Sequence, residues 1–272
     1  MQRQPLTTIA AACATTIAMA FFLETAHADA VTDWNVKTGE WITDAKIGTP
    51  PAVRVMALSQ SAVYEATNAI TKRYPSGLSA IDAPSGASLD AAVAAASRAS
   101  LVKLLPSQQT AIDSHYQATI AQLADDPARA AGIAVGEKAA AAVLAARADD
   151  TTRATSADAY RPQTTAGAYV PTAFTAASQW PQRTPWLMKN AAQFRPGPPP
   201  ALTSETWARD FNEVKALGSK SSTQRSAQQT EIARFWDYSL PAVYQGIVRS
   251  VASQPGRDVA RNARLFAAVA QA

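Results

Sequence analysis

Outside its first 28 residues the sequence contains one histidine, His115, and no cysteine. A histidine can act as the base of a nucleophilic triad with a serine and an aspartate. The Gly-x-Ser-x-Gly turn that presents such a serine between a strand and a helix is absent, and His115 borders an apolar stripe with helical spacing. We therefore expect His115 to be a surface histidine and not a catalytic base.

The remaining residue types that could bind a metal are carboxylates. Asp125-Asp126 and Asp149-Asp150 are neighbouring pairs that could bind calcium. Acidic pairs at predicted helix ends more often serve capping and the helix dipole, and Asp126 stands before Pro127 as a natural N-cap. Cysteine-ligated centres, disulfides and sites with two histidines from this chain are excluded, and Gly-rich phosphate loops are absent.

The counts of one histidine and no cysteine apply to the chain after an N-terminal signal segment has been removed. Arg3, an apolar run from Leu6 to Leu23 and the triplet Ala26-His27-Ala28 together predict a secretory signal over residues 1–28, with Asp29 as the first mature residue. A retained membrane anchor is the alternative, but the run is rich in Ala and Thr and is short for a spanning helix. A lipoprotein attached through Cys13 is a weaker alternative. We expect a periplasmic or secreted protein that has no membrane segment after cleavage.

The composition is that of a soluble globular protein, with 47% hydrophobic and 17% charged residues. The residues that give the net charge of +4 are distributed along the whole sequence, and no run of Lys and Arg alternates with aromatic residues. Nucleic acid is therefore not an expected partner. Residues 29–272 are long enough to form one large helical domain or two small ones, with a sizeable core.

The periodicity of apolar residues predicts an all-α, multi-helix bundle, because no stretch alternates long enough for a sheet. Trp34 and Trp41 are predicted core anchors, and Gly132, Gly136 and Ala140 should let a neighbouring helix approach closely. The helix from Leu89 to Leu105 and the one opened by Pro106 should form an antiparallel pair. The predicted helices are Asp33 to Lys46, Thr49 to the Pro75-Ser76-Gly77 turn, Leu89 to Leu105, a segment opened by Pro106, Pro127 to about Arg147, a segment closed by Gly218, Thr223 to Asp237, a segment opened by Pro241 and a last one after Gly256.

Two regions depart from simple helical packing. Residues 149–201 are a long irregular loop rich in Pro, Thr, Gln and Gly, whose aromatic residues should pin it to a helical surface as a structural strap or, alternatively, as a substrate-facing cover. The last helix has Val259, Ala263, Phe266 and Ala270 on one face. An apolar patch around Val259, Phe266 and Val269 must be covered by something.

Two segments resemble the N-terminal half of bacterial vanadium-dependent haloperoxidase-like proteins, which share a helical fold with phosphatidic-acid-type acid phosphatases. They are RVMALSQSAVYEATNAITKRY, from Arg54, and PPPALTSETWARDFNEVKALGSKSSTQRSAQQTEIARFW, from Pro198. In this family vanadate or phosphate is held by a Lys and an Arg ahead of a Pro, by a Pro-Ser-Gly-His segment, and by a Ser-Arg segment followed by a second His.

Only partial matches to these motifs occur here. Pro75-Ser76-Gly77 is followed by Leu78 where the motif needs histidine, and the spacing from Lys189 to Arg195-Pro196 is one residue shorter than in the family. Ser97-Arg98 is followed at the expected distance by Leu104, again in place of histidine. The three matches also occur in the wrong order. We therefore assign no catalytic, cofactor-binding or metal-binding residue in this chain.

Two hypotheses follow. In the first, the chain is the N-terminal helical half of an exported haloperoxidase-like or phosphatase-like protein, truncated before its active-site half and inactive alone. The resemblance implies that the complete protein would bind vanadate and oxidise halide with peroxide, or would hydrolyse phosphate esters. Its partner would be the missing C-terminal half, or a second copy bound through the last helix. In the second hypothesis, the chain is a free-standing periplasmic helical module that binds a protein partner through the exposed face of its last helix.

Overall fold

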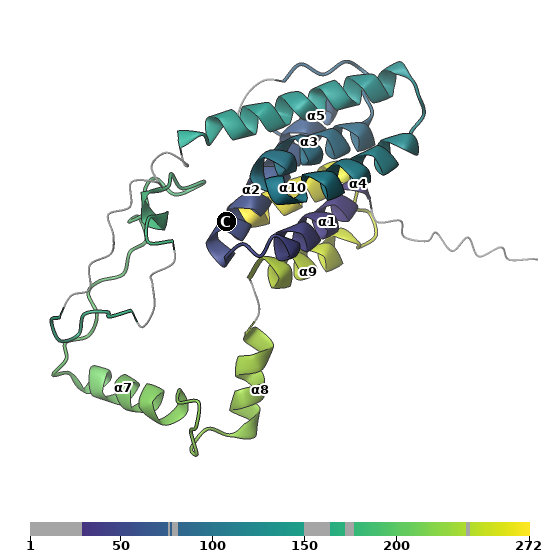
Figure 1. Cartoon of the computed structure of the whole chain (residues 1–272). Helices are drawn as coiled ribbons and strands as arrows, with labels where there is room; N and C mark the ends of the chain where they lie inside the picture. The colour runs from purple at the N-terminus through teal and green to yellow at the C-terminus, as the bar shows by residue number, and fades with distance from the viewer. Residues whose placement is uncertain (1–28, 76, 78–80, 150–163, 172–176, 238–239) are drawn as a thin grey trace, which may run out of the picture.

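The computed structural model of the chain describes residues 29–75, 77, 81–149, 164–171, 177–237 and 240–272. These residues form α-helices and short 3-10 turns and contain no strand, which confirms the all-α prediction (Figure 1). The signal segment predicted for residues 1–28 lies outside them. The helices are α1 (Ala30–Asp44), α2 (Thr49–Thr71), α3 (Leu89–Leu104), α4 (Gln109–Ala121), α5 (Pro127–Ala146), α7 (Glu205–Leu217), α8 (Ala227–Trp236), α9 (Leu240–Ala252) and α10 (Val259–Gln271).

Local capping explains where most of these helices begin. The side chain of Asp29 accepts a hydrogen bond from the backbone N–H of Thr32 at 2.9 Å, so α1 starts three residues before the predicted Asp33. Asp126 caps α5 in the same way through Arg129, as predicted. At its other end α2 stops at Thr71, because Lys72 adopts a left-handed conformation with φ of 50° before the predicted Pro75 turn is reached.

The core is centred on α2, which packs against α3, α5 and α10. Trp34 and Trp41 on α1 are buried, as predicted, and their rings meet edge to face with centroids 5.9 Å apart. The face of α2 that carries Ala52, Met56, Ser59, Val63 and Ala66 is buried, and Ile70 at the end of this face is partly exposed. None of the helices in the described part of the chain has both the length and the apolar composition that a membrane span requires.

The closest helix pair is formed by α3 and α5. A Cβ atom added to Gly132 would clash with the carbonyl oxygen of Ser88, and one added to Gly136 would clash with the carbonyl oxygen of Ala92. The two glycines therefore allow the backbones to touch, and the prediction of close approach is confirmed. The pairing predicted between α3 and α4 is present, but α3 packs far more extensively on α5.

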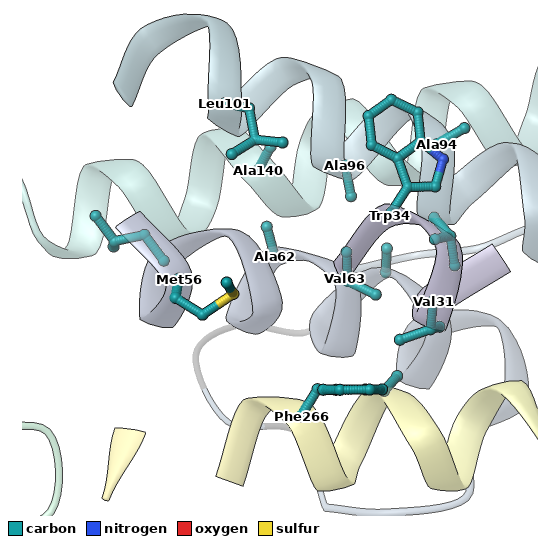
Figure 2. Close-up of a cluster of buried hydrophobic side chains, with 14 of the residues drawn as sticks. Val31, Trp34, Met56, Ala62, Val63, Ala94, Ala96, Leu101, Ala140 and Phe266 are labelled. Atoms are coloured by element: carbon teal, nitrogen blue, oxygen red, sulfur yellow. The ribbon is translucent and has the colours of Figure 1, made fainter. Parts of the chain in front are cut away.

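The last helix corrects the prediction of an exposed apolar patch. Phe266 is completely buried in the cluster that also contains Val31 and Val63, and it points from α10 towards α2 in Figure 2. Val259 is half-buried against the same cluster, and Val269 remains 37% exposed. The stripe on α10 is therefore covered from within the bundle by α1 and α2.

The segment around Trp186 attaches the long loop to the bundle. Arg147 lies over the ring of Trp186, 3.8 Å from its centroid, and donates a hydrogen bond of 2.7 Å to the carbonyl oxygen of Thr184. Tyr169 and Phe194 are exposed, whereas Tyr160 and Phe174 lie outside the described residues. The strap prediction therefore holds for the segment around Trp186, which packs against the bundle core.

Beyond the loop, α7 and α8 stand away from the bundle (Figure 1) and contain no buried residue. Ser226 and Gln229 form a capping box that starts α8 four residues after the predicted Thr223. Gly218 follows the end of α7 as predicted, but with φ of −78°, so a left-handed conformation is not what ends this helix.

Candidate functional site

His115 is the residue on which a catalytic site in this chain would depend, and the structure corrects its predicted surface position. It is half-buried on α4, where its ring packs edge to face on Trp34 and Trp41 with centroids 4.7 and 5.7 Å apart. The apolar stripe of α4 that faces the core, Ile112 and Tyr116, flanks this position and brings the imidazole to the side of α1.

Burial lowers the pKa of His115, because the charged imidazolium loses hydration against the two tryptophans. The ammonium group of Lys37 lowers it further, while the carboxylates of Asp33 and Glu40 act in the opposite direction. His115 is therefore a mostly neutral imidazole at pH 7.

This shift makes a prediction about stability. The unfolded chain binds a proton at His115 near pH 6.5, and the folded chain binds it only at lower pH, so stability should fall as the pH falls below about 6.5. The loss should stop once the pH is below the folded-state pKa. Urea unfolding between pH 5 and pH 8 measures this slope, and the C2–H resonance of His115 measures the folded-state pKa directly. The His115→Gln variant should lose this part of the slope; an unchanged slope would assign it to other groups.

A cavity of about 720 Å³ lies beside His115, between α1 and α4 and the first turns of α3 and α10. Its lining includes three carboxylates, from Asp29, Asp33 and Asp90, and one ammonium group, from Lys37. No serine lines it. The arrangement therefore does not assemble the triad considered above, and its charge disfavours an anionic ligand.

The other candidate residues have structural partners. Asp125 forms an ion pair with Arg129 while Asp126 caps α5, so this carboxylate pair organises a helix start. Of the second carboxylate pair, the structure describes Asp149, whereas Asp150 lies outside the described residues. In the described part of the chain no group of three or more His, Cys, Asp or Glu side chains is arranged to hold a metal ion.

The three partial motif matches lie on separate elements. Arg98 on α3 is bonded to Asp113 at 2.6 Å and lies over the ring of Tyr116, so it serves the packing of α4. Lys189 and Arg195 belong to the exposed irregular segment before α7. Gly77 lies against the buried carboxyl of Glu65, and Ser76 is outside the described residues. In the described part of the chain these residues are not gathered into the cluster of two imidazoles and several cations that holds vanadate or phosphate in the family that the sequence resembles.

Comparison with known proteins supplies the context for this fold. Neither a protein-family model nor a curated protein sequence matches the chain. A crystal structure described as the first bacterial vanadium-dependent iodoperoxidase superposes with a TM-score of 0.68 at 21% sequence identity, over 89% of this chain. The chain has a haloperoxidase-like fold. It spans 65% of the length of the iodoperoxidase chain, so about a third of that structure has no counterpart here.

Sequence analysis missed one surface of this haloperoxidase-like fold. Tyr244, Ile247 and Val251 form an exposed apolar stripe on α9, beside the buried face of the helix that carries Val248 and Ala252. The signal was available in principle, because the apolar residues of this segment cover more of the helix circumference than one buried face needs. Only the folded arrangement tells which part of that circumference is left uncovered.

Proposed function

We propose that this chain is the helical scaffold of an exported haloperoxidase-like protein, and that its oxyanion-binding residues are supplied by polypeptide outside these 272 residues. The observation that carries the proposal is the unequal coverage of the fold match: 89% of this chain but only 65% of the iodoperoxidase chain. The absence of a two-histidine, cation-rich cluster from the described residues supports it. The complete protein would oxidise halide with peroxide, or would hydrolyse phosphate esters.

The first prediction from this proposal is that the mature chain alone neither brominates a dye with peroxide and vanadate nor releases phosphate from an aryl ester. A single imidazole cannot both bond the oxyanion and act as acid or base, and the cavity at His115 is lined by three carboxylates. Turnover is measured with the wild type and with His115→Ala. Vanadate-dependent activity that disappears in the variant would contradict the proposal.

The DNA beyond codon 272 provides the decisive test. It should encode, in this frame or a shifted one, a Lys followed by Arg-Pro, then Pro-Ser-Gly-His, then Ser-Arg with a downstream His. Joining this segment to residues 29–272 should produce the activity that the shorter chain lacks. Downstream DNA that encodes nothing of the kind in any frame would remove the support for truncation.

Export is the second part of the proposal. Ala26-His27-Ala28 suits a signal peptidase, so secretion should yield a product that begins at Asp29. The intact mass of the exported protein measures this directly. A mass that includes residues 1–28 would show that the segment is retained.

A binding module is the second candidate function, and α7 and α8 favour it. Both are amphipathic helices without a buried residue, and Phe211, Phe235 and Trp236 are exposed on them. Exposed apolar faces of this kind are used in helix-mediated recognition. The binding module becomes the better supported function if the DNA beyond codon 272 encodes no such segment.

A further inference from the structure

Asp29, which the proposed cleavage would make the first residue of the mature chain, is bonded to the last helix. One of its carboxylate oxygens, Oδ1, accepts the hydrogen bond from the backbone N–H of Thr32 that caps α1. The other, Oδ2, accepts a hydrogen bond of 2.5 Å from the side-chain amide of Asn262 on α10, 233 positions further along the sequence. We call Asp29 and Asn262 the clamp, because together they join the start of α1 to α10.

Two further hydrogen bonds hold Asn262 in place. The residue is 2% exposed, its Nδ2 also donates to the carbonyl oxygen of Ala252 at the end of α9 at 3.1 Å, and its Oδ1 accepts from Nε of Arg257 at 2.8 Å. The amide therefore cannot turn away from Asp29 without leaving buried polar groups unsatisfied. These bonds lie within the contacts that α1, α9 and α10 make with one another (Figure 1), so they do not depend on any polypeptide beyond Ala272.

The residues that follow Asp29 are part of the core. Val31 has no exposed surface and Trp34 is 1% exposed, and the backbone N–H of Asp33 donates to the carbonyl oxygen of Asp29 at 3.0 Å. A peptidase cleaves a bond whose neighbouring residues are accessible and released from folded structure. To present the bond before Asp29 in this way, residues 29–31 would have to leave the bundle. That movement breaks the clamp and the cap of α1 and exposes Val31 to water.

We propose that the clamp sets the order of processing and folding: the signal segment is removed before α1 docks, and the folded precursor resists signal peptidase. This inference rests on the export that the proposed function includes. Cleavage adds one water molecule across the Ala28–Asp29 peptide bond, which leaves a carboxylate on Ala28 and an α-amino group on Asp29. The cleaved chain then closes the clamp, and its first residue becomes a fixed part of the bundle.

An order-of-addition experiment with the full precursor, residues 1–272, tests this order. Precursor diluted from urea directly into purified signal peptidase in detergent should be cleaved at the bond before Asp29. Precursor that has refolded before the peptidase is added, as checked by circular dichroism, should be cleaved at least about 100-fold more slowly, because only the rare opened form is a substrate.

The Asn262→Ala variant opens the clamp without changing the residues around the cleaved bond. Refolded precursor with this change should be cleaved at least about tenfold faster than refolded wild type, the factor by which a hydrogen bond to a charged group favours the closed form. Gln271→Ala is the matched control, because it removes a side-chain hydrogen bond of 2.8 Å to Ser61 from the other end of α10. It should leave the cleavage rate unchanged. In the mature chain, hydrogen exchange of the Thr32 amide should accelerate in Asn262→Ala and not in Gln271→Ala.

The possible failures are distinguishable. Equal cleavage before and after refolding, with a product that begins at Asp29, would overturn the proposed order while export stays supported. Asn262→Ala precursor that is cleaved no faster than Gln271→Ala precursor would overturn the role of the clamp. A precursor that cannot refold while residues 1–28 are attached would do the same, because the signal segment itself would then set the order. Absence of cleavage in both orders of addition would contradict export, and this inference with it.

Discussion

Replacing Phe266 by alanine is expected to lower the free energy of unfolding by about 3–5 kcal/mol, the cost of removing a fully buried aromatic ring and leaving a cavity. Phe266 has no exposed surface, and it is the largest side chain that α10 contributes to the core around α2. Loss of this ring weakens the attachment of the last helix to the bundle. Urea unfolding of the mature chain, followed by circular dichroism, measures the difference.

Val269→Ala is the matched control, because Val269 lies on the same helix, one turn further on, and is 37% exposed. Its cost should stay below about 1 kcal/mol. If the two variants cost equally little, then α10 does not pack on α2 in solution. That result would favour the hypothesis that the apolar face of α10 is exposed and binds a partner.

The prediction of the helices from sequence succeeded where the signals are local. A capping residue such as Asp126 contacts a backbone N–H only three residues away, so its role can be predicted without tertiary structure. The same holds for the spacing of Gly132 and Gly136, which requires only that some helix lies opposite. Which helix lies opposite is a long-range property, and the neighbour expected for α3 was therefore only partly correct.

The errors have a common physical cause. Periodicity shows that a helix has an apolar face but does not show what covers it. For this reason Phe266 was expected to be uncovered although α2 lies against it, whereas the apolar stripe at Ile247 on α9 was not noticed. His115 was expected at the surface because no residue near it in sequence indicates that Trp34 and Trp41 lie against its ring.

Part of the chemistry of the candidate site can be predicted without a structure, because it depends on residue types alone. One histidine and no cysteine after residue 28 exclude two-histidine and thiolate sites in any fold. What needed the structure was the charge around that histidine. Three carboxylates at the adjacent cavity come from α1, its N-cap and α3, and their proximity to His115 on α4 is set by tertiary contacts alone.

Replacing Gly136 by alanine should destabilise the protein by roughly 1–3 kcal/mol, although alanine favours a helix by about 1 kcal/mol over glycine. The added methyl group would clash with the carbonyl oxygen of Ala92 and would lie 2.8 Å from the backbone nitrogen of Ala96. Backbone atoms inside α3 cannot rotate away, so α5 must move and part of their contact is lost. The free energy of unfolding in urea measures the net effect.

Gly39→Ala is the matched control, because Gly39 is also inside a helix and its added methyl group would meet nothing within 4 Å. This variant should be more stable than the wild type by about 0.5–1 kcal/mol, so the same substitution should change the free energy of unfolding in opposite directions at the two positions.

A further variant with Gly132→Ala and Gly136→Ala together should lose less stability than the sum of the two single changes. Both methyl groups press on the same backbone contact, and once α5 has moved for one of them the second finds space. Stabilisation by Gly136→Ala, or strict additivity in the double variant, would mean that α3 and α5 do not lie at this distance in solution.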